Sequence, residues 1–130
     1  MSERKKGKQA ILVVEDEADV LTLVARTAEL EGYHVLRATD GSAGLHLLQE
    51  NRVDMVILDL RLPVMDGWEV FQQMKNNPQL KGIPVVVLSA SASPETQEEA
   101  LEKGAAAFLV KPVNLDDLIK TLRRVLRGRR

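Results

Sequence analysis

Short apolar runs alternate with helical patterns along most of the chain. Five runs rich in aliphatic residues predict strands, and they lie at 11–14, 34–38, 55–58, 84–88 and 107–110. Between and after them, apolar residues recur at helical spacing and predict five helices. The run at 34–38 alternates with polar residues, as expected of a strand near a sheet edge. The alternation predicts βα units with right-handed crossovers and a parallel sheet covered by helices on both faces.

The fourth expected helix, at about 94–103, differs from the others in its composition. Ser93 is placed to cap it, and its thin apolar face consists of Ala100 and Leu101. Little apolar burial implies a low free-energy cost of local opening, which suits an element that moves. The last helix, capped by Asn114, is by contrast strongly apolar on one face and basic on the other.

Length and composition restrict the class of protein. The chain has 130 residues, 45% of them hydrophobic, which is enough for one domain with a real core. It has no Cys, so disulfides and thiolate chemistry are excluded. No apolar run approaches the roughly 20 residues of a membrane span, and the N-terminus lacks the apolar stretch of a signal peptide. We therefore expect a cytoplasmic protein with no membrane partner.

The net charge of −1 conceals a strong segregation of charge. Residues 1–8 carry +3, residues 9–119 carry −10 and residues 120–130 carry +6. We expect a flexible basic N-terminus at 1–8, one domain at 9–127 and a basic tail at 128–130. The aromatic content is 3%, which leaves no stacking surface for nucleic acid, so no specific nucleic-acid partner is expected.

Chemically active side chains follow four of the expected strands. The acidic run at 15–17 follows the first strand, Asp59 the third, Ser89 the fourth and Lys111 the fifth, whereas the edge strand is followed by a capping turn. Because the carboxyl ends of parallel strands meet at one edge of the sheet, these groups are expected to form one site.

The residue types at this edge suit phosphoryl chemistry. Oxygen ligands without His or Cys favour Mg²⁺, which would also relieve the repulsion between neighbouring carboxylates. Asp59 is placed as a nucleophile that forms an acyl phosphate, with Lys111 and Ser89 holding the phosphoryl oxygens. Taken singly, the acidic run fits a solvated helix start, Asp59 a turn cap and Lys111 a surface lysine. Their joint position favours a site.

Over about residues 9–127 the sequence resembles the receiver domain of two-component response regulators. Four segments carry the resemblance, in the order Ile11-Leu-Val-Val-Glu15-Asp16-Glu17, Asp59-Leu-Arg-Leu-Pro63 with Met65-Asp66-Gly67, Val86-Val87-Leu88-Ser89-Ala90, and Phe108-Leu-Val-Lys111-Pro112. The resemblance implies an α/β fold, a (βα)5 flavodoxin-like doubly wound parallel five-stranded sheet with strand order 2-1-3-4-5.

The resemblance also implies a phosphoacceptor and a metal site. Asp59 would accept a phosphoryl group, and Mg²⁺ would be bound by Asp16, Asp59 and the backbone carbonyl of Arg61, with Glu15 helping through a water. Glu15 stands where the family more often has Asp. We further hypothesise that Arg61 and Ser91 tune the lifetime of the phosphoryl group by controlling the attacking water.

A conformational switch is implied by the same resemblance. Lys111 would pair with the phosphoryl group, and Ser89 would swing toward it after transfer. Phe108 would move inward behind Ser89, and any switch there must be steric because Phe lacks the hydroxyl of the more frequent Tyr. The peptide bond between Lys111 and Pro112 would be cis.

The implied partners are a histidine kinase or a histidine phosphotransfer protein as donor and a downstream protein target. Phosphorylation would switch the face made by the fourth helix, the fifth strand and the last helix. The acidic fourth helix beside the basic last helix suits a phosphorylation-dependent homodimer, and two solvated faces explain the charges equally well. No output domain is visible in the sequence, so we expect a stand-alone receiver or one excised from a larger regulator or hybrid kinase.

Other classes of function remain as alternatives. A Mg²⁺-dependent phosphohydrolase with an aspartyl nucleophile usually needs a second acid two residues further on, where this chain has Arg61. A phosphorylation-independent pseudo-receiver would not need the full set of Glu15, Asp16, Asp59 and Lys111. A flavin-binding flavodoxin would need a phosphate-binding loop after the first strand. We therefore predict a signalling module that catalyses only its own phosphorylation and dephosphorylation and is not otherwise an enzyme.

Overall fold

The structure is a computed structural model that describes residues 7–91 and 93–127. The basic segment predicted at 1–8 lies outside these residues apart from its last two positions, and the basic tail at 128–130 lies outside them entirely.

Strands and helices alternate along the described residues as the sequence pattern predicts. The strands are β1 (Ala10–Val14), β2 (His34–Ala38), β3 (Met55–Asp59), β4 (Val85–Ser89) and β5 (Ala107–Val110). The helices are α1 (Ala18–Leu30), α2 (Gly41–Glu50), α3 (Gly67–Lys75), α4 (Pro94–Glu102) and α5 (Leu115–Leu126). Within the described part of the chain, every helix is too short or too polar to cross a membrane.

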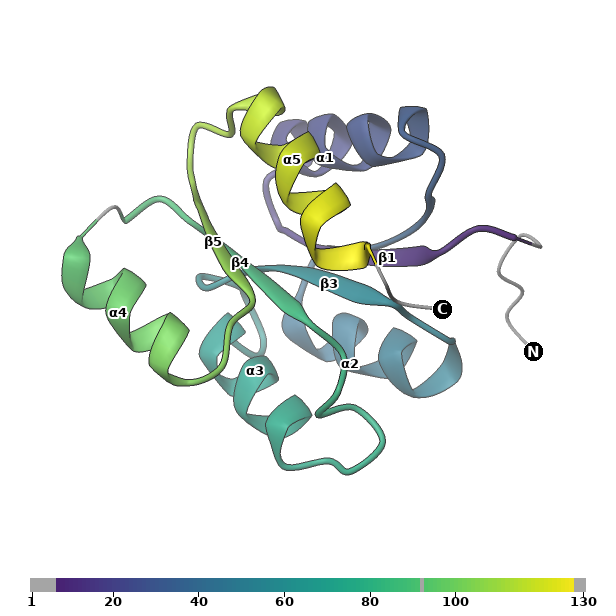
Figure 1. Cartoon of the computed structure of the whole chain (residues 1–130). Helices are drawn as coiled ribbons and strands as arrows, with labels where there is room; N and C mark the ends of the chain where they lie inside the picture. Colours follow the sequence, from purple (N-terminus) through teal and green to yellow (C-terminus); the bar gives the residue numbers. More distant parts are fainter. Residues whose placement is uncertain (1–6, 92, 128–130) are drawn as a thin grey trace.

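The strands form one parallel sheet in the order β2-β1-β3-β4-β5, which confirms the predicted topology. Helices α1 and α5 cover one face of this sheet, and α2 and α3 cover the other (Figure 1). Helix α4 lies next to β5, beyond α3 (Figure 1). The chain reverses its direction of winding between β1 and β3, the position at which sites form in open α/β sheets.

Alternate residues of the central strands supply two separate cores. On the α2 and α3 side, Leu12, Val56 and Val87 pack with apolar residues of both helices. On the α1 and α5 side, Val13 and Ile57 pack with Val24, Leu118 and other apolar residues of those helices. Every residue of β1, β3 and β4 is buried, so the strands that end at the predicted site are held rigidly.

The predicted strand limits are wrong by one residue at four strand ends. β1 begins at Ala10 rather than residue 11, and β3 includes Asp59. β4 begins after Pro84, which has no N–H to donate to a ladder, and it extends to Ser89. In the sheet register, Asp59 pairs with Leu88 and Ser89 with Val110. Two of the predicted site residues are therefore part of the sheet itself.

Candidate functional site

The residues predicted from the strand ends come together at the carboxyl edge of the sheet. Asp59 and Ser89 are the last residues of β3 and β4, and both are buried. Glu15 directly follows β1, and Lys111 directly follows β5. The parallel sheet thus gathers four segments that are far apart in the sequence, as the strand-end pattern predicts.

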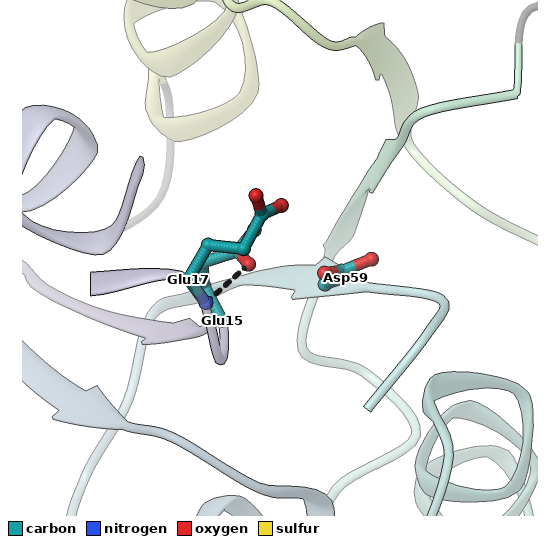
Figure 2. Close-up of side chains that lie close together, drawn as sticks. All are labelled: Glu15, Glu17 and Asp59. Atoms are coloured by element: carbon teal, nitrogen blue, oxygen red, sulfur yellow. Dashed lines mark hydrogen bonds between the residues drawn. The ribbon is translucent and has the colours of Figure 1, made fainter. Parts of the chain in front are cut away.

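The ammonium of Lys111 lies among three carboxylates. Its Nζ is 2.7 Å from Oε1 of Glu17, 2.9 Å from Oε1 of Glu15 and 3.0 Å from Oδ2 of Asp59. Figure 2 shows the acids alone, with Glu15 and Glu17 from the segment after β1 and Asp59 from the end of β3. Three acids and one base leave this cluster with an excess of negative charge.

Glu15 is the most deeply buried of the three acids. Its side chain is 0% exposed, and its Oε2 accepts a hydrogen bond from the backbone N–H of Glu17 at 2.9 Å (Figure 2). Its Oε1 contacts the Lys111 ammonium but has no hydrogen-bond donor of suitable geometry among the described residues. Burial raises the pKa of Glu15 to about 7, and Asp59 adds to the rise, although Lys111 and the Glu17 N–H oppose it.

The protonation equilibrium of the Lys111 side chain is shifted toward the charged ammonium form. Burial acts to lower its pKa, but the close contacts of its ammonium with the carboxylates of Glu17, Glu15 and Asp59 outweigh burial, so the pKa rises above the ordinary value for lysine. Lys111 therefore remains a cation throughout the physiological pH range.

A hollow of about 640 Å³ opens beside Asp59 at the same edge of the sheet. Among the residues that line it are Asp16, Arg61, Trp68, Ser89, Ser91 and Thr96. The backbone N–H of Arg61 donates to Oδ1 of Asp59 at 3.0 Å, and the backbone N–H of Ser91 donates to the hydroxyl oxygen of Ser89 at 3.0 Å. Both side chains are thus oriented by the loops that follow their strands.

The remaining predicted residues lie next to this edge. Phe108 is half-buried in β5, pairs in register with Val87 and packs against the core on the α2 and α3 side. The Lys111–Pro112 peptide bond is cis. Asp16 is exposed and borders the hollow, but its carboxylate is not one of the three that surround Lys111.

A close backbone contact fixes the loop between Asp59 and α3. A Cβ added at Gly67 would collide with the carbonyl oxygen of Asp59 and lie 2.7 Å from Cα of Leu60. The Gly67 N–H donates to the carbonyl of Leu60 at 3.0 Å. In the same loop, three residues before Gly67, Val64 has a φ of 69°, in the left-handed region that β-branched residues rarely adopt. The loop that lines the hollow is therefore tightly constrained.

The donor set fits a hard divalent cation. Ligand oxygens of Glu15, Glu17 and Asp59 lie within 4.8 Å of one another, and the one ammonium among them leaves an excess of negative charge. Carboxylate oxygens without nitrogen or sulfur are the ligands that Mg²⁺ prefers. This acidic cluster resembles the Mg²⁺ site of a receiver domain.

Glu17 is the residue to which the sequence assigned no role. It lies in the acidic run, but its contact with Lys111 was not predicted. The sequence held no clear signal for this contact, but the structure shows why it can form: Glu17 occupies the N-cap position of α1, where Glu is a poor capping residue, and its side chain makes no cap hydrogen bond. A glutamate at that position is available for another contact.

A doubly wound parallel sheet with acids, a lysine and a hydroxyl at its carboxyl edge places this chain among the flavodoxin-like α/β proteins, and sequence comparison gives the family. The family model for the response regulator receiver domain matches residues 11–123. The chain belongs to the response regulator receiver family of two-component signalling.

Individual relatives agree with this assignment. The transcriptional regulatory protein PrrA of Mycobacterium tuberculosis is 39% identical over 119 residues, which cover 92% of this chain and 50% of PrrA. This chain therefore spans half the length of that relative. The chemotaxis response regulator CheY4 of Vibrio cholerae is 37% identical with a TM-score of 0.85, covering 92% of this chain and 99% of CheY4.

A third relative is described with a metal. The receiver domain of the sensor histidine kinase PA1611 from Pseudomonas aeruginosa, solved with a magnesium ion coordinated in the active site cleft, is 28% identical. Its TM-score is 0.83, and the match covers 92% of this chain and 98% of that domain.

Proposed function

We propose that this receiver domain accepts a phosphoryl group on Asp59 from a phosphohistidine of a histidine kinase or histidine phosphotransfer protein. The observation that carries the proposal is the position of Lys111, whose ammonium lies 3.0 Å from Oδ2 of Asp59. Ser89 ends the neighbouring strand and borders the adjoining hollow. A nucleophile, a cation and a hydroxyl are the groups that an in-line phosphoryl transfer needs.

In the proposed transfer, an Asp59 oxygen forms a bond to phosphorus as the P–N bond of the phosphohistidine breaks. The electron pair of that bond returns to the imidazole nitrogen. The Arg61 N–H holds Oδ1 of Asp59, which leaves Oδ2 directed toward Lys111. Lys111 and the Ser89 hydroxyl would then hold the oxygens of the transferred group.

We infer that Mg²⁺ is the cofactor. Asp16, Asp59 and the backbone carbonyl of Arg61 would bind it, with Glu15 assisting, and a bound cation would neutralise charge on the carboxylates and the phosphoryl oxygens. The support from the structure is the all-oxygen donor set and the negative charge that remains on the three acids after the single ammonium of Lys111 is counted.

The proposed response to phosphorylation is a movement of Ser89 and Phe108 that alters the face made by α4, β5 and α5. Helix α4 has only Ala100 buried among its nine residues, all of which are described, so it is the helix with the least apolar attachment to this sheet. Arg61 and Ser91, which line the hollow, would control the water that hydrolyses the aspartyl phosphate.

The proposed output is binding of a downstream protein in the cytoplasm, with a phosphorylation-dependent homodimer as one form of it. Helix α4 is acidic and α5 carries Arg123 and Arg124 in its last turn, which would allow a self-complementary contact. Outside its own phosphorylation and dephosphorylation, we propose no catalytic activity for the domain.

Intact-mass measurement tests the proposal. Incubation with acetyl phosphate and Mg²⁺ should add one labile phosphoryl group, with acetate as the leaving group. The Asp59→Ala variant and an EDTA-treated sample should gain none. Steady turnover of generic phosphoesters would favour a phosphohydrolase instead, and an unmodified wild-type chain with every donor would favour a pseudo-receiver.

A further inference from the structure

Lys111 has one carboxylate partner that the fold does not require. Oε1 of Glu17 accepts a hydrogen bond from Nζ at 2.7 Å, the shortest of the three contacts of this ammonium. The Glu17 side chain is 61% exposed, whereas those of Glu15 and Asp59 are buried. Because it neither caps α1 nor fills the core, folding alone does not explain its position.

The backbone of Glu17 directs this contact. Its N–H donates to Oε2 of Glu15, so the segment after β1 is tied to a fully buried acid (Figure 2). From this fixed backbone the side chain reaches Lys111 at the end of β5, on the far side of β3 and β4 in the sheet. The contact is therefore more restrained than an ion pair between two free surface side chains.

The two acids that follow Glu15 lie in different surroundings. Asp16 borders the hollow together with Arg61 and Ser89. Glu17 instead faces the Lys111 ammonium at 2.7 Å and does not line the hollow. In this arrangement the partner of Glu17 is the lysine.

We propose that Glu17 is a positioning residue that holds Lys111 while Asp59 carries no phosphoryl group and releases it when one arrives. The inference rests on the proposed function. To bind phosphoryl oxygens, Lys111 has to exchange a carboxylate partner, and the exposed Glu17 is the one that water can solvate without reorganising the core. Glu17 therefore competes with an incoming anionic donor and slows phosphorylation by small phosphodonors.

The test compares the wild type with Glu17→Gln and with the matched control Asp19→Asn. Asp19 is an exposed acid in the first turn of α1, so its neutralisation changes the net charge equally without removing a Lys111 contact. With Mg²⁺ in excess, Glu17→Gln should raise the initial rate of phosphorylation by acetyl phosphate, and the affinity for the phosphoryl mimic beryllofluoride, about two- to fivefold, the size expected for a restrained exposed ion pair. Asp19→Asn should change neither quantity.

A spectroscopic measurement separates positioning from a general effect of charge. In the Glu17→Gln variant the ¹⁵Nζ resonance of Lys111 should move in the free protein and coincide with that of the wild type once beryllofluoride is bound. The inference would be overturned if Glu17→Gln and wild type were phosphorylated at equal rates, or if the Lys111 ¹⁵Nζ resonance did not move. It would also be overturned if Asp19→Asn changed the phosphorylation rate as much as Glu17→Gln does. None of these outcomes would contradict phosphorylation of Asp59. A wild type that neither accepts phosphoryl nor binds beryllofluoride would instead refute the proposed function.

Discussion

The carboxylate of Glu15 and the ammonium of Lys111 lie 2.9 Å apart, the first fully buried and the second 12% exposed. They follow β1 and β5, between which β3 and β4 lie in the sheet. The lysine side chain thus spans the carboxyl edge of the sheet and contacts Asp59 on the way. Because the acid is buried and only partly compensated, this pair makes the stability of the metal-free domain depend on pH.

Stability of the metal-free domain should fall as the pH rises from about 5 to about 8. Glu15 titrates near pH 7 in the folded state and near its ordinary value of 4.5 in the unfolded chain. Between these values the folded state binds more protons than the unfolded state, so the unfolding free energy decreases with pH, by up to about 3 kcal/mol over the window. Urea unfolding in EDTA at several pH values measures this slope.

The matched variant for this prediction is Glu15→Gln, which keeps the shape of the side chain and cannot titrate. Its stability should be nearly flat over the same pH window. Excess Mg²⁺ should flatten the wild-type profile as well, because a bound cation favours the deprotonated acid. If the unfolding free energy of the wild type instead rose from pH 5 to pH 8, a group other than Glu15 would dominate its pH dependence.

Replacing Lys111 by Met should destabilise the metal-free domain by about 3 kcal/mol at pH 8. The substitution leaves Glu15, Asp59 and Glu17 together without their shared cation, and removal of one partner of a buried pair is costly. Excess Mg²⁺ should recover most of the loss, since it supplies the missing positive charge. Urea unfolding with and without Mg²⁺ checks both expectations.

Lys103→Met is the control for loss of a lysine. Lys103 pairs with Glu99 at 3.3 Å, and both side chains are more than half exposed. Its removal should cost less than about 1 kcal/mol and should be insensitive to Mg²⁺. Equal losses in the two variants would contradict a special electrostatic role for Lys111.

The resemblance to the receiver family supplied the sheet order, which the structure confirms, whereas the approach of Asp59 and Lys111 could be predicted from the strand ends alone. The apolar runs are short and bounded, and the carboxyl ends of parallel strands meet at one edge whatever the details of packing. The limits of the strands were less accurate, because hydrophobicity does not show that a ladder continues through the polar residues Asp59 and Ser89.

The contact of Glu17 with Lys111 could not be read from the sequence. In the chain Glu17 is the third acid of a run at a helix start, a setting in which most acids are solvated. Its contact depends on the length of the lysine side chain across two intervening strands and on the hydrogen bond of its N–H to Glu15. Both are properties of the tertiary structure.

Gly67→Ala should destabilise the domain by about 2 kcal/mol or more. The new Cβ would collide with the carbonyl oxygen of Asp59, and since that obstacle is backbone it has no rotamer by which to move away. Displacement of this backbone should also weaken beryllofluoride binding at Asp59. Gly82→Ala is the control, because nothing lies within 4 Å of a Cβ at that position. A tolerated Gly67→Ala would show that the loop after β3 adapts.

Ser93→Ala should increase local opening of α4. The Ser93 hydroxyl accepts a hydrogen bond from the Thr96 N–H at 3.2 Å and caps a helix whose only buried residue is Ala100. Loss of an N-cap costs about 1 kcal/mol, so hydrogen exchange of α4 amides should become about fivefold faster. Amide exchange followed residue by residue by NMR measures the change.

The comparison with Asp40→Ala shows whether α4 opens by itself. Asp40 caps α2, accepting from the Ala43 N–H at 2.8 Å, and α2 is held to the sheet by four buried residues. Both variants should lower the global unfolding free energy by about 1 kcal/mol. Only Ser93→Ala should speed exchange in α4. Asp40→Ala removes the α2 cap equally from the states with α4 closed and α4 open, so it leaves the free energy of α4 opening unchanged. If α4 amides exchange as slowly as those of β3 in the wild type, α4 does not open separately, and the proposed movement of the face formed by α4, β5 and α5 loses its physical basis.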